Sequence, residues 1–494
     1  MAHDQDDPRR AAALAMHRFG LGPKRNSIAE IASDPRGALL AEIERPGIGC
    51  INNPDLLSAS AAARAGFEAR SERRAQTIVA QRAQKETERL AAEGSAEMQA
   101  SAQTGISDDL ARKAAAAKAA DAALADQGVT ERERQNFFKE VKARLDAAFD
   151  ADIGFAERLV WFWSNHFCVS TFTVYNMAGG YEREAIRPHI LGRFADMLLA
   201  AEGHSAMLIY LDNSISMGAN SVAGINQTRG LDENLAREIL ELHTLGVRSG
   251  YNQDDVISFA NVLTGWTVIP QVGNPVNGTE FVFNPRMHEP GSKRVLGKFY
   301  PDSGLEQGRA VLADLARHPA TATHVATKLA RYFSADDPPP PLVERLAKTF
   351  RDTEGDLKEM AKTLVVSEEC WSPAREKLKR PCEWVVSMAR ATGIRSNTER
   401  FTQGQAAMGE PVWRPTAPQG YADNEGAWID GMGLRLDVAN SVAERVADRV
   451  EPREFLDTAL GPLASPETRQ AVARAESGPQ ALALAFMAPE FQRR

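Results

Sequence analysis

A short segment from Asn234 to Trp266 holds the residues of this chain that are best suited to chemistry. It begins NLAREILELHTLG, so its first turns carry an amide, a guanidinium and two carboxylates, at Asn234, Arg237, Glu238 and Glu241. Burying a carboxylate or a guanidinium is costly unless the group is paired or binds something. A helix that only filled a core would not need all four groups. The segment is therefore either a buried polar network or a site.

Helical spacing brings these groups together. Asn234, Glu238 and Glu241 follow the i, i+4, i+7 pattern of one helix face. Arg237 precedes Glu241 by four residues, which suits an ion pair. Three interpretations stay open, because perturbed charges mark structural networks as well as sites. The first is a structural ion-pair network. The second is a ligand-binding or catalytic cluster, with Glu238 or Glu241 as general acid or base and Arg237 as an anion clamp. The third is a metal site.

No cofactor is indicated, but a divalent metal is compatible with these residue types. Carboxylates three residues apart on a helix serve metals in helical bundles, provided that other helices supply matching ligands. The residues available for that role are His166, His189, Asp212 and His288. Whether they converge depends on the fold.

Two histidines lie in settings that suit a site. His166 lies in WFWSNHF, where Asn165 is placed to orient it, or where the ring packs among aromatic residues. His288 lies in MHEPG between two expected strands, where Pro290 and Gly291 stiffen the turn, so we expect an exposed histidine on a rigid loop. No G-x-S-x-G or H-E-x-x-H motif occurs. The candidate catalytic residues are Glu238, Glu241, His166 and His288, and the candidate binding residues are Asn165, Arg187, Asn234, Arg237 and Asp212.

The elements that must position these residues are predicted to be mostly α-helical. We expect residues 1–54 to form the N-terminal helical part of a body, 55–150 an inserted arm, and 151–494 the main helical body. The short apolar runs EFVFN and RVLGKFY, separated by PRMHEPGSK, predict a small β-hairpin near 279–300. The expected fold is a multi-helix globular body with this hairpin and a long inserted helical hairpin.

The inserted arm differs from the body in composition. Residues 55–150 are rich in Ala, Arg, Glu and Gln, which favour helix with mixed charge. Thr130 and Glu133 have the spacing of a capping box for its last helix. The apolar stripe of the arm is mostly alanine and too thin for a firm coiled coil. The arm is either a solvated projection or a surface that docks a partner.

Bulk composition excludes several classes of protein. The chain has 494 residues, 43% hydrophobic and 25% charged, as in soluble globular proteins. Its net charge of −8 argues against a nucleic-acid partner. Its four cysteines form no C-x-x-C pair, which excludes zinc-finger and thioredoxin types. No apolar run is long enough for a membrane span. The acidic N-terminus does not resemble a signal peptide, so the cytoplasm is the default expectation.

Eight motifs stand out along the chain: RLVWFWSNHF (158–167), YEREAIRPHILGRF (181–194), AMLIYLDN (206–213), ENLAREILELHTLGV (233–247), LTGW (263–266), HEPG (288–291), HPATA (318–322) and KLARYF (328–333). Taken together, they resemble a bacterial family catalogued as domain of unknown function 1800. The resemblance covers most of the chain outside the arm. The chain departs from the family at residues 232–234, where Asn-Glu-Asn is usual, and at 288–291, where His-Asp-Pro-Gly is commoner.

The resemblance implies no settled activity. Members of the family are often exported, and they are often encoded beside proteins of domain of unknown function 1501, which look like the sulfatase and alkaline-phosphatase fold. This implies a protein partner and an envelope-related role. By analogy with the family, the alternative to the default cytoplasmic location is export. We therefore expect a hydrolase-like or ligand-binding protein with a polar pocket. The alternative is a non-enzymatic assembly partner of such a sulfatase-like protein, docking through the helical arm.

Overall fold

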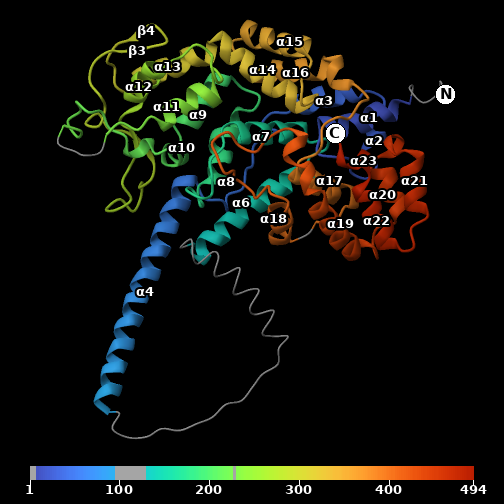
Figure 1. Cartoon of the computed structure of the whole chain (residues 1–494), viewed down its shortest axis with the longest axis horizontal. Coiled ribbons are helices and arrows are strands. Elements are labelled where there is room, and N and C mark those ends of the chain that lie inside the picture. The colour runs from blue at the N-terminus through green and yellow to red at the C-terminus, as the bar shows by residue number, and fades with distance from the viewer. Residues whose placement is uncertain (1–6, 95–128, 226–229, 396) are drawn as a thin grey trace.

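The computed structural model describes residues 7–94, 129–225, 230–395 and 397–494. These residues form a mostly helical body, and one long helix extends away from it (Figure 1). The α-helices are α1 (Pro8–Arg18), α2 (Ser27–Glu30), α3 (Pro35–Glu44), α4 (Ala59–Gly94), α6 (Glu131–Asp150), α7 (Phe155–His166), α8 (Ala178–Tyr181), α9 (Phe194–Glu202), α10 (Ser205–Tyr210), α11 (Asn234–Glu238), α12 (Gln253–Leu263), α13 (Leu305–Arg317), α14 (Pro319–Phe333), α15 (Pro340–Asp352), α16 (Leu357–Val366), α17 (Pro381–Thr392), α18 (Thr398–Ala407), α19 (Met432–Val446), α20 (Pro452–Ala459), α21 (Pro466–Ala473), α22 (Gly478–Met487) and α23 (Pro489–Gln492).

Shorter helical turns and four strands connect these helices. The π-helical turns are η1 (Glu182–Ile186) and η4 (Ile239–His243). The 3-10 turns are η2 (Arg187–His189), η3 (Asn213–Ile215), η5 (Glu368–Trp371), η6 (Glu425–Ala427), η7 (Ile429–Gly431) and η8 (Gly461–Leu463). The strands are β1 (Trp266–Val268), β2 (Phe281–Phe283), β3 (Lys293–Val295) and β4 (Lys298–Tyr300). The predicted fold class, mostly α with a small β element, is confirmed.

Helix boundaries follow local sequence signals. The capping box of Thr130 and Glu133 begins α6 as predicted, and Asn252 with Asp255 begins α12 in the same way. Proline in the first turn begins α14, where the missing N–H costs no helical hydrogen bond. The helix ends at Phe333, ahead of the run of prolines that precedes α15.

One hydrophobic core runs through the body and contains Phe19, Trp163, Phe194 and Trp384, all buried. The two ends of the chain meet at its edge. The His17 ring lies 2.7 Å from the carbonyl oxygen of Ala459, and α1 packs against η8. Figure 1 shows α1, α2 and α23 close together on one side. Burial of these apolar surfaces is the main force that joins sequence-distant helices.

The β element pairs differently from the prediction. Strand β1 is antiparallel to β2, with Trp266 opposite Phe283, and β3 is antiparallel to β4. The runs EFVFN and RVLGKFY were predicted to pair with each other, and that pairing is wrong. Leu296 and Gly297 both have positive φ, at 49° and 78°. Two such residues make the tight turn of a two-residue hairpin, so RVLGKFY folds back on itself.

The inserted region contributes one clear projection. Helix α4 leaves the body in Figure 1, and its base packs against α6 and α8. From Arg70 to Arg82 nearly every side chain is exposed. The second limb of the predicted helical hairpin falls on residues 95–128, outside the described residues. Within the described ranges, no helix has both the length and the apolar character needed to cross a membrane.

Candidate functional site

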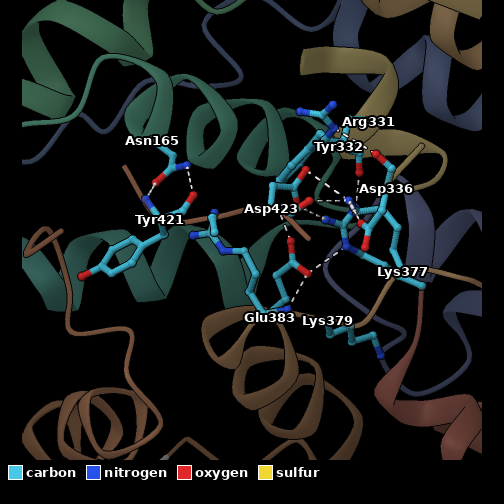
Figure 2. A network of polar contacts seen from close by, with 12 residues as sticks. Asn165, Arg331, Tyr332, Asp336, Lys377, Lys379, Glu383, Tyr421 and Asp423 are labelled. Atoms are coloured by element: carbon cyan, nitrogen blue, oxygen red, sulfur yellow. Dashed lines mark hydrogen bonds and ion pairs between the residues drawn. The ribbon is translucent and has the colours of Figure 1, made fainter. Parts of the chain in front are cut away.

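A cavity of about 630 Å³ lies between α7, α14 and the segment 411–428, which we call the strap. Figure 2 shows part of its wall and the polar network beside it. Its lining mixes aromatic, basic, acidic and amide side chains, as small-ligand sites do. The lining residues are Phe162, Asn165, His166, Lys328, Arg331, Tyr332, Asp336, Asp337, Gln419, Tyr421, Ala422, Asp423, Asn424 and Gly426.

A histidine and a lysine pair in the wall of this cavity. The Lys328 Nζ lies 2.8 Å from Nδ1 of His166. The other ring nitrogen, Nε2, lies 3.1 Å from the main-chain carbonyl oxygen of His243. A carbonyl oxygen only accepts, so Nε2 carries the ring proton and Nδ1 accepts from the lysine. Burial and the nearby Lys328 charge lower the pKa of His166 well below its usual range, so its ring is neutral at pH 7.

Lys328 has an unusual proton affinity. Burial of its side chain lowers the pKa of Lys328 to about 8. Among the described residues, it forms no ion pair with a carboxylate. A lysine that titrates this close to neutrality holds a proton at pH 7 and gives it up readily. The sequence prediction missed Lys328, whose only signal was its place in the motif KLARYF.

A second buried pair, His243 and Glu202, lies next to His166. Nδ1 of His243 lies 2.8 Å from a carboxylate oxygen of Glu202, and both side chains are fully buried. His243 belongs to the π-helical turn η4, and π turns often occur at functional sites. The contact with Glu202 is made by the same residue whose carbonyl group faces Nε2 of His166.

The strap is fastened to α7 by side chains. The Asn165 amide bonds the main chain of Tyr421 twice, donating to its oxygen at 2.9 Å and accepting from its nitrogen at 2.8 Å (Figure 2). Ser170 donates to the carbonyl oxygen of Pro415 at 3.0 Å. The indole of Trp413 donates to Glu182 at 2.8 Å. A long irregular segment is thus held in one conformation over the cavity.

Two of the three acidic residues that line the cavity are paired with cations, and the third, Asp337, is exposed. Asp336 lies 2.8 Å from the Lys377 ammonium, and Asp423 lies 3.3 Å from both Lys377 and Arg494 (Figure 2). Arg331 uses Nε to donate to the main-chain oxygen of Asp336 at 3.0 Å, and its side chain lines the cavity. Among the described residues, Lys328 and Arg331 are cations of the lining that form no ion pair with a carboxylate.

The structure brings only part of the predicted site together. Asn165 and His166 line the cavity. Arg187 is buried elsewhere, 2.7 Å from Glu157 and 3.1 Å from Glu182, in an ion-pair network that joins helices. Asp212 is exposed and has positive φ, at 57°. Neither Arg187 nor Asp212 contributes to the cavity wall.

His288 is buried, and the expectation of an exposed loop histidine is wrong. Its side chain is only 6% exposed, and Nδ1 lies 2.8 Å from the main-chain oxygen of Thr264. The cause is the strand pairing. Because β2 pairs back to β1, the segment after β2 crosses the end of α12, where the Thr264 hydroxyl accepts from the main-chain nitrogen of Glu289 at 2.8 Å. His288 does not line the cavity.

The polar helix from Asn234 forms its own surface cluster. Arg237 lies 2.8 Å from Glu233 and 3.8 Å from Glu241, so the predicted ion pair with Glu241 is present. Burial raises the pKa of Glu238, which is half-buried. The α-helix gives way to the π turn η4 after Glu238, so the i, i+4, i+7 pattern does not continue through Glu241. These carboxylates lie outside the lining of the cavity.

No metal centre is evident in the part of the chain that the structure describes. In those residues, no three His, Cys, Asp or Glu side chains are grouped so that they would hold a metal ion.

Comparison with known proteins gives a family and no relative of known activity. The model of a family described as a protein of unknown function (DUF1800) matches residues 14–493, nearly the whole chain. No curated protein matches the chain, and no solved structure matches it.

Proposed function

We propose a ligand-binding function for this chain, which belongs to the family of proteins of unknown function named DUF1800. The cavity between α7, α14 and the strap binds a small polar molecule that carries an anionic group. Lys328 and Arg331 bind the anionic group, and the Lys328–His166 pair moves a proton to or from the ligand. The 2.8 Å contact between Lys328 Nζ and His166 Nδ1 carries the proposal.

The choice of an anionic ligand rests on the balance of charge. Asp336 and Asp423 are already paired with Lys377 and Arg494, so they do not cancel the charge of Lys328. Hydrogen bonds between a cation and a carboxylate or phosphate are stronger than neutral ones. An anion placed between Lys328 and Arg331 would relieve the repulsion between these two cations.

The choice of proton transfer rests on the state of the two groups. Nδ1 of His166 has a lone pair directed at the lysine, and Lys328 titrates at about pH 8. A positioned group whose pKa lies near the working pH serves best as general acid or base. Lys328 is then the proton donor to the ligand, and His166 holds the lysine in place. Hydrolase-like chemistry is one reaction class that this pair suits.

The proposal predicts that anion binding depends on Lys328. Calorimetric titration of the full chain with inorganic phosphate and with succinate, each a probe, should show an affinity that Lys328→Met or Arg331→Met weakens about tenfold or more, because a charged hydrogen bond is lost. Binding should also weaken as pH rises from 7 to 9, since Lys328 loses its charge near pH 8.

Lys348→Met is the matched control, since this lysine lies on the exposed face of α15 and pairs with Asp352. The affinity of the Lys348→Met variant for phosphate and succinate should equal that of the unchanged protein. Equal affinity in Lys328→Met, or binding that does not change between pH 7 and pH 9, would rule the proposal out.

Glu238 and Glu241, with Arg237 as anion clamp and Asn234 beside them, remain a proposed second acid–base cluster. Burial raises the pKa of Glu238, and perturbed carboxyl groups of this kind occur in acid–base sites. None of these residues lines the cavity, so the cluster would act on a separate ligand at the surface of α11 and η4.

A second candidate function is assembly with another protein through α4. From Arg70 to Arg82 this helix is exposed, and Ile78 and Val79 are 42% and 65% exposed. An apolar pair on a solvated helix suits contact with a partner. The partner implied by family resemblance is a sulfatase-like protein of domain of unknown function 1501.

A further inference from the structure

A second cleft, remote from the cavity, lies between α17, α18 and α19. It has a volume of about 350 Å³, and we call it the arginine cleft. Its floor is apolar: Met388, Phe401 and Val446 are buried, and Val442 and Ile394 are partly buried against the core. The apolar surface that solvent still reaches is mainly that of Val442 and Ile394, and covering it would be favourable.

Four arginines surround this apolar floor: Arg395, Arg400, Arg445 and Arg449. Arg395 is already paired, 3.5 Å from Asp146 and also in contact with Asp150. Among the described residues, the other three form no ion pair with a carboxylate. Arg445 donates only to the hydroxyl of Ser441, at 2.7 Å, one turn back on its own helix.

Three arginines without a carboxylate partner among the described residues share the rim of the cleft. Arg445 lies in the last turn of α19, Arg449 follows the end of that helix, and both line the cleft, so like charges share one rim and repel each other. Arg400 adds a third unpaired guanidinium from α18. A bound anion would turn this repulsion into attraction. Guanidinium groups bind carboxylates with two parallel hydrogen bonds, which makes a carboxylate a good match.

We propose that the arginine cleft binds the carboxylate of a free single-chain fatty acid, with the acyl chain covering the apolar floor. The acyl chain takes the place of water over the partly buried Val442 and Ile394. The carboxylate lies between Arg445, Arg449 and Arg400. The volume lies at the small end of the range of ligand pockets, roughly 300–1,000 Å³, which favours one medium-length chain over a two-chain lipid.

The test is calorimetric titration of the full chain with dodecanoate below its micelle concentration. We expect saturable binding that the double variant Arg445→Gln/Arg449→Gln weakens about tenfold or more. Val442→Arg, which puts a charge on the floor, should abolish it. Thermal unfolding confirms that each variant is folded. Arg317→Gln/Arg351→Gln is the matched control, since both arginines are exposed on α13 and α15, and it should bind as the unchanged protein does.

Three outcomes would overturn the proposal. The first is the absence of saturable dodecanoate binding. The second is dodecanol binding as tightly as dodecanoate, which would remove the role of the carboxylate. The third is arginine-dependent sedimentation with vesicles of an anionic phospholipid without binding of dodecanoate, which would assign the cleft to a membrane surface. Equal binding in the double variant and the unchanged protein would also contradict it.

Discussion

At the scale of single residues, the environment of a side chain decides its chemistry more than its type does. His166 and His288 were both candidates by residue type and local sequence. One has a ring nitrogen that accepts a hydrogen bond from Lys328 in a cavity, and the other is buried beneath the end of α12. Lys328 was not among the predicted residues, although burial is the main cause that lowers its pKa to about 8.

Asn165 provides a prediction at this scale. Its side chain makes two hydrogen bonds with the main chain of Tyr421, and it is the residue before the histidine of the site. Asn165→Ala should destabilise the protein by about 1–2 kcal/mol, since two partly buried backbone groups lose their partners. Amide hydrogen exchange in the strap, residues 411–428, should become faster while exchange in α14 stays unchanged.

Asn261→Ala is the control for this experiment. Its amide only donates to the carbonyl oxygen of Ile257 on its own helix, at 3.0 Å. It should leave exchange in the strap unaltered. If the strap exchanged equally slowly in Asn165→Ala, the hydrogen bonds to Tyr421 would not be what holds it.

At the scale of elements, irregular segments position the site as much as helices do. The π turn η4 places the His243 carbonyl group toward His166, and the strap closes one side of the cavity. Helix α4 is the opposite case. It is regular and long, but its side chains from Arg70 to Arg82 are exposed to solvent. A helix of this kind gains little stability from packing, so an interaction with another protein would give its exposed face a role.

The proposed docking role of α4 predicts loss of a partner without loss of the fold. Ile78→Asp/Val79→Asp should leave thermal unfolding within about 0.5 kcal/mol of the unchanged protein, because both side chains are exposed. Co-purification of the sulfatase-like partner should be lost. Val272→Asp/Val276→Asp changes two apolar residues that are 77% and 80% exposed on the body, and it should retain the partner. Retention by the α4 variant would contradict docking through this face.

At the scale of the whole molecule, one buried carboxylate connects distant parts of the chain. Glu383 on α17 is fully buried, 2.8 Å from Arg158 on α7 and 2.9 Å from Arg494, and it accepts from the Tyr332 hydroxyl at 3.1 Å. Burial alone would raise its pKa, but the guanidinium groups of Arg494 and Arg158 outweigh burial and hold the pKa well below its usual range. Elements from across the sequence therefore meet at one ionised group.

Removing this charge should destabilise the whole molecule. Glu383→Gln removes the carboxylate partner of the buried Arg158 and leaves Arg494 with Asp423 alone, so we expect a loss of about 3–5 kcal/mol in denaturant unfolding at pH 7. The pKa is lower in the folded state, so the stabilisation is present above the unfolded pKa and is lost as pH falls. The difference between variant and unchanged protein should shrink below about pH 4.

Glu306→Gln is the comparison at this scale, because its partner Arg309 lies 2.7 Å away on the surface of α13. An exposed pair of this kind contributes little, so its loss should cost less than about 1 kcal/mol. Similar effects of the two substitutions, or a Glu383→Gln difference that does not change with pH, would show that Glu383 does not join the helices electrostatically.

Local patterns were sufficient for much of the fold. Apolar periodicity and the capping box of α6 depend on neighbouring residues alone, and these predictions are confirmed. The capping box of α12 and the prolines around α14 are local signals of the same kind. The ion pair of Arg237 and Glu241 also follows from spacing within one helix. The pairing of the strands could not be predicted from local patterns, because the sequence of a short strand does not specify which other strand it pairs with.

The sequence by itself determined the helical class, the family and the types of residue available for chemistry, since each of these depends on composition, spacing or local motif. Only the tertiary structure decided that Lys328 meets His166, that Asp336 and Asp423 are neutralised, and that His288 is buried. Those facts depend on contacts between α7, α14 and the strap, which are far apart along the chain. Burial and long-range charge set the proton affinity of each group, and neither can be read from its neighbours in sequence.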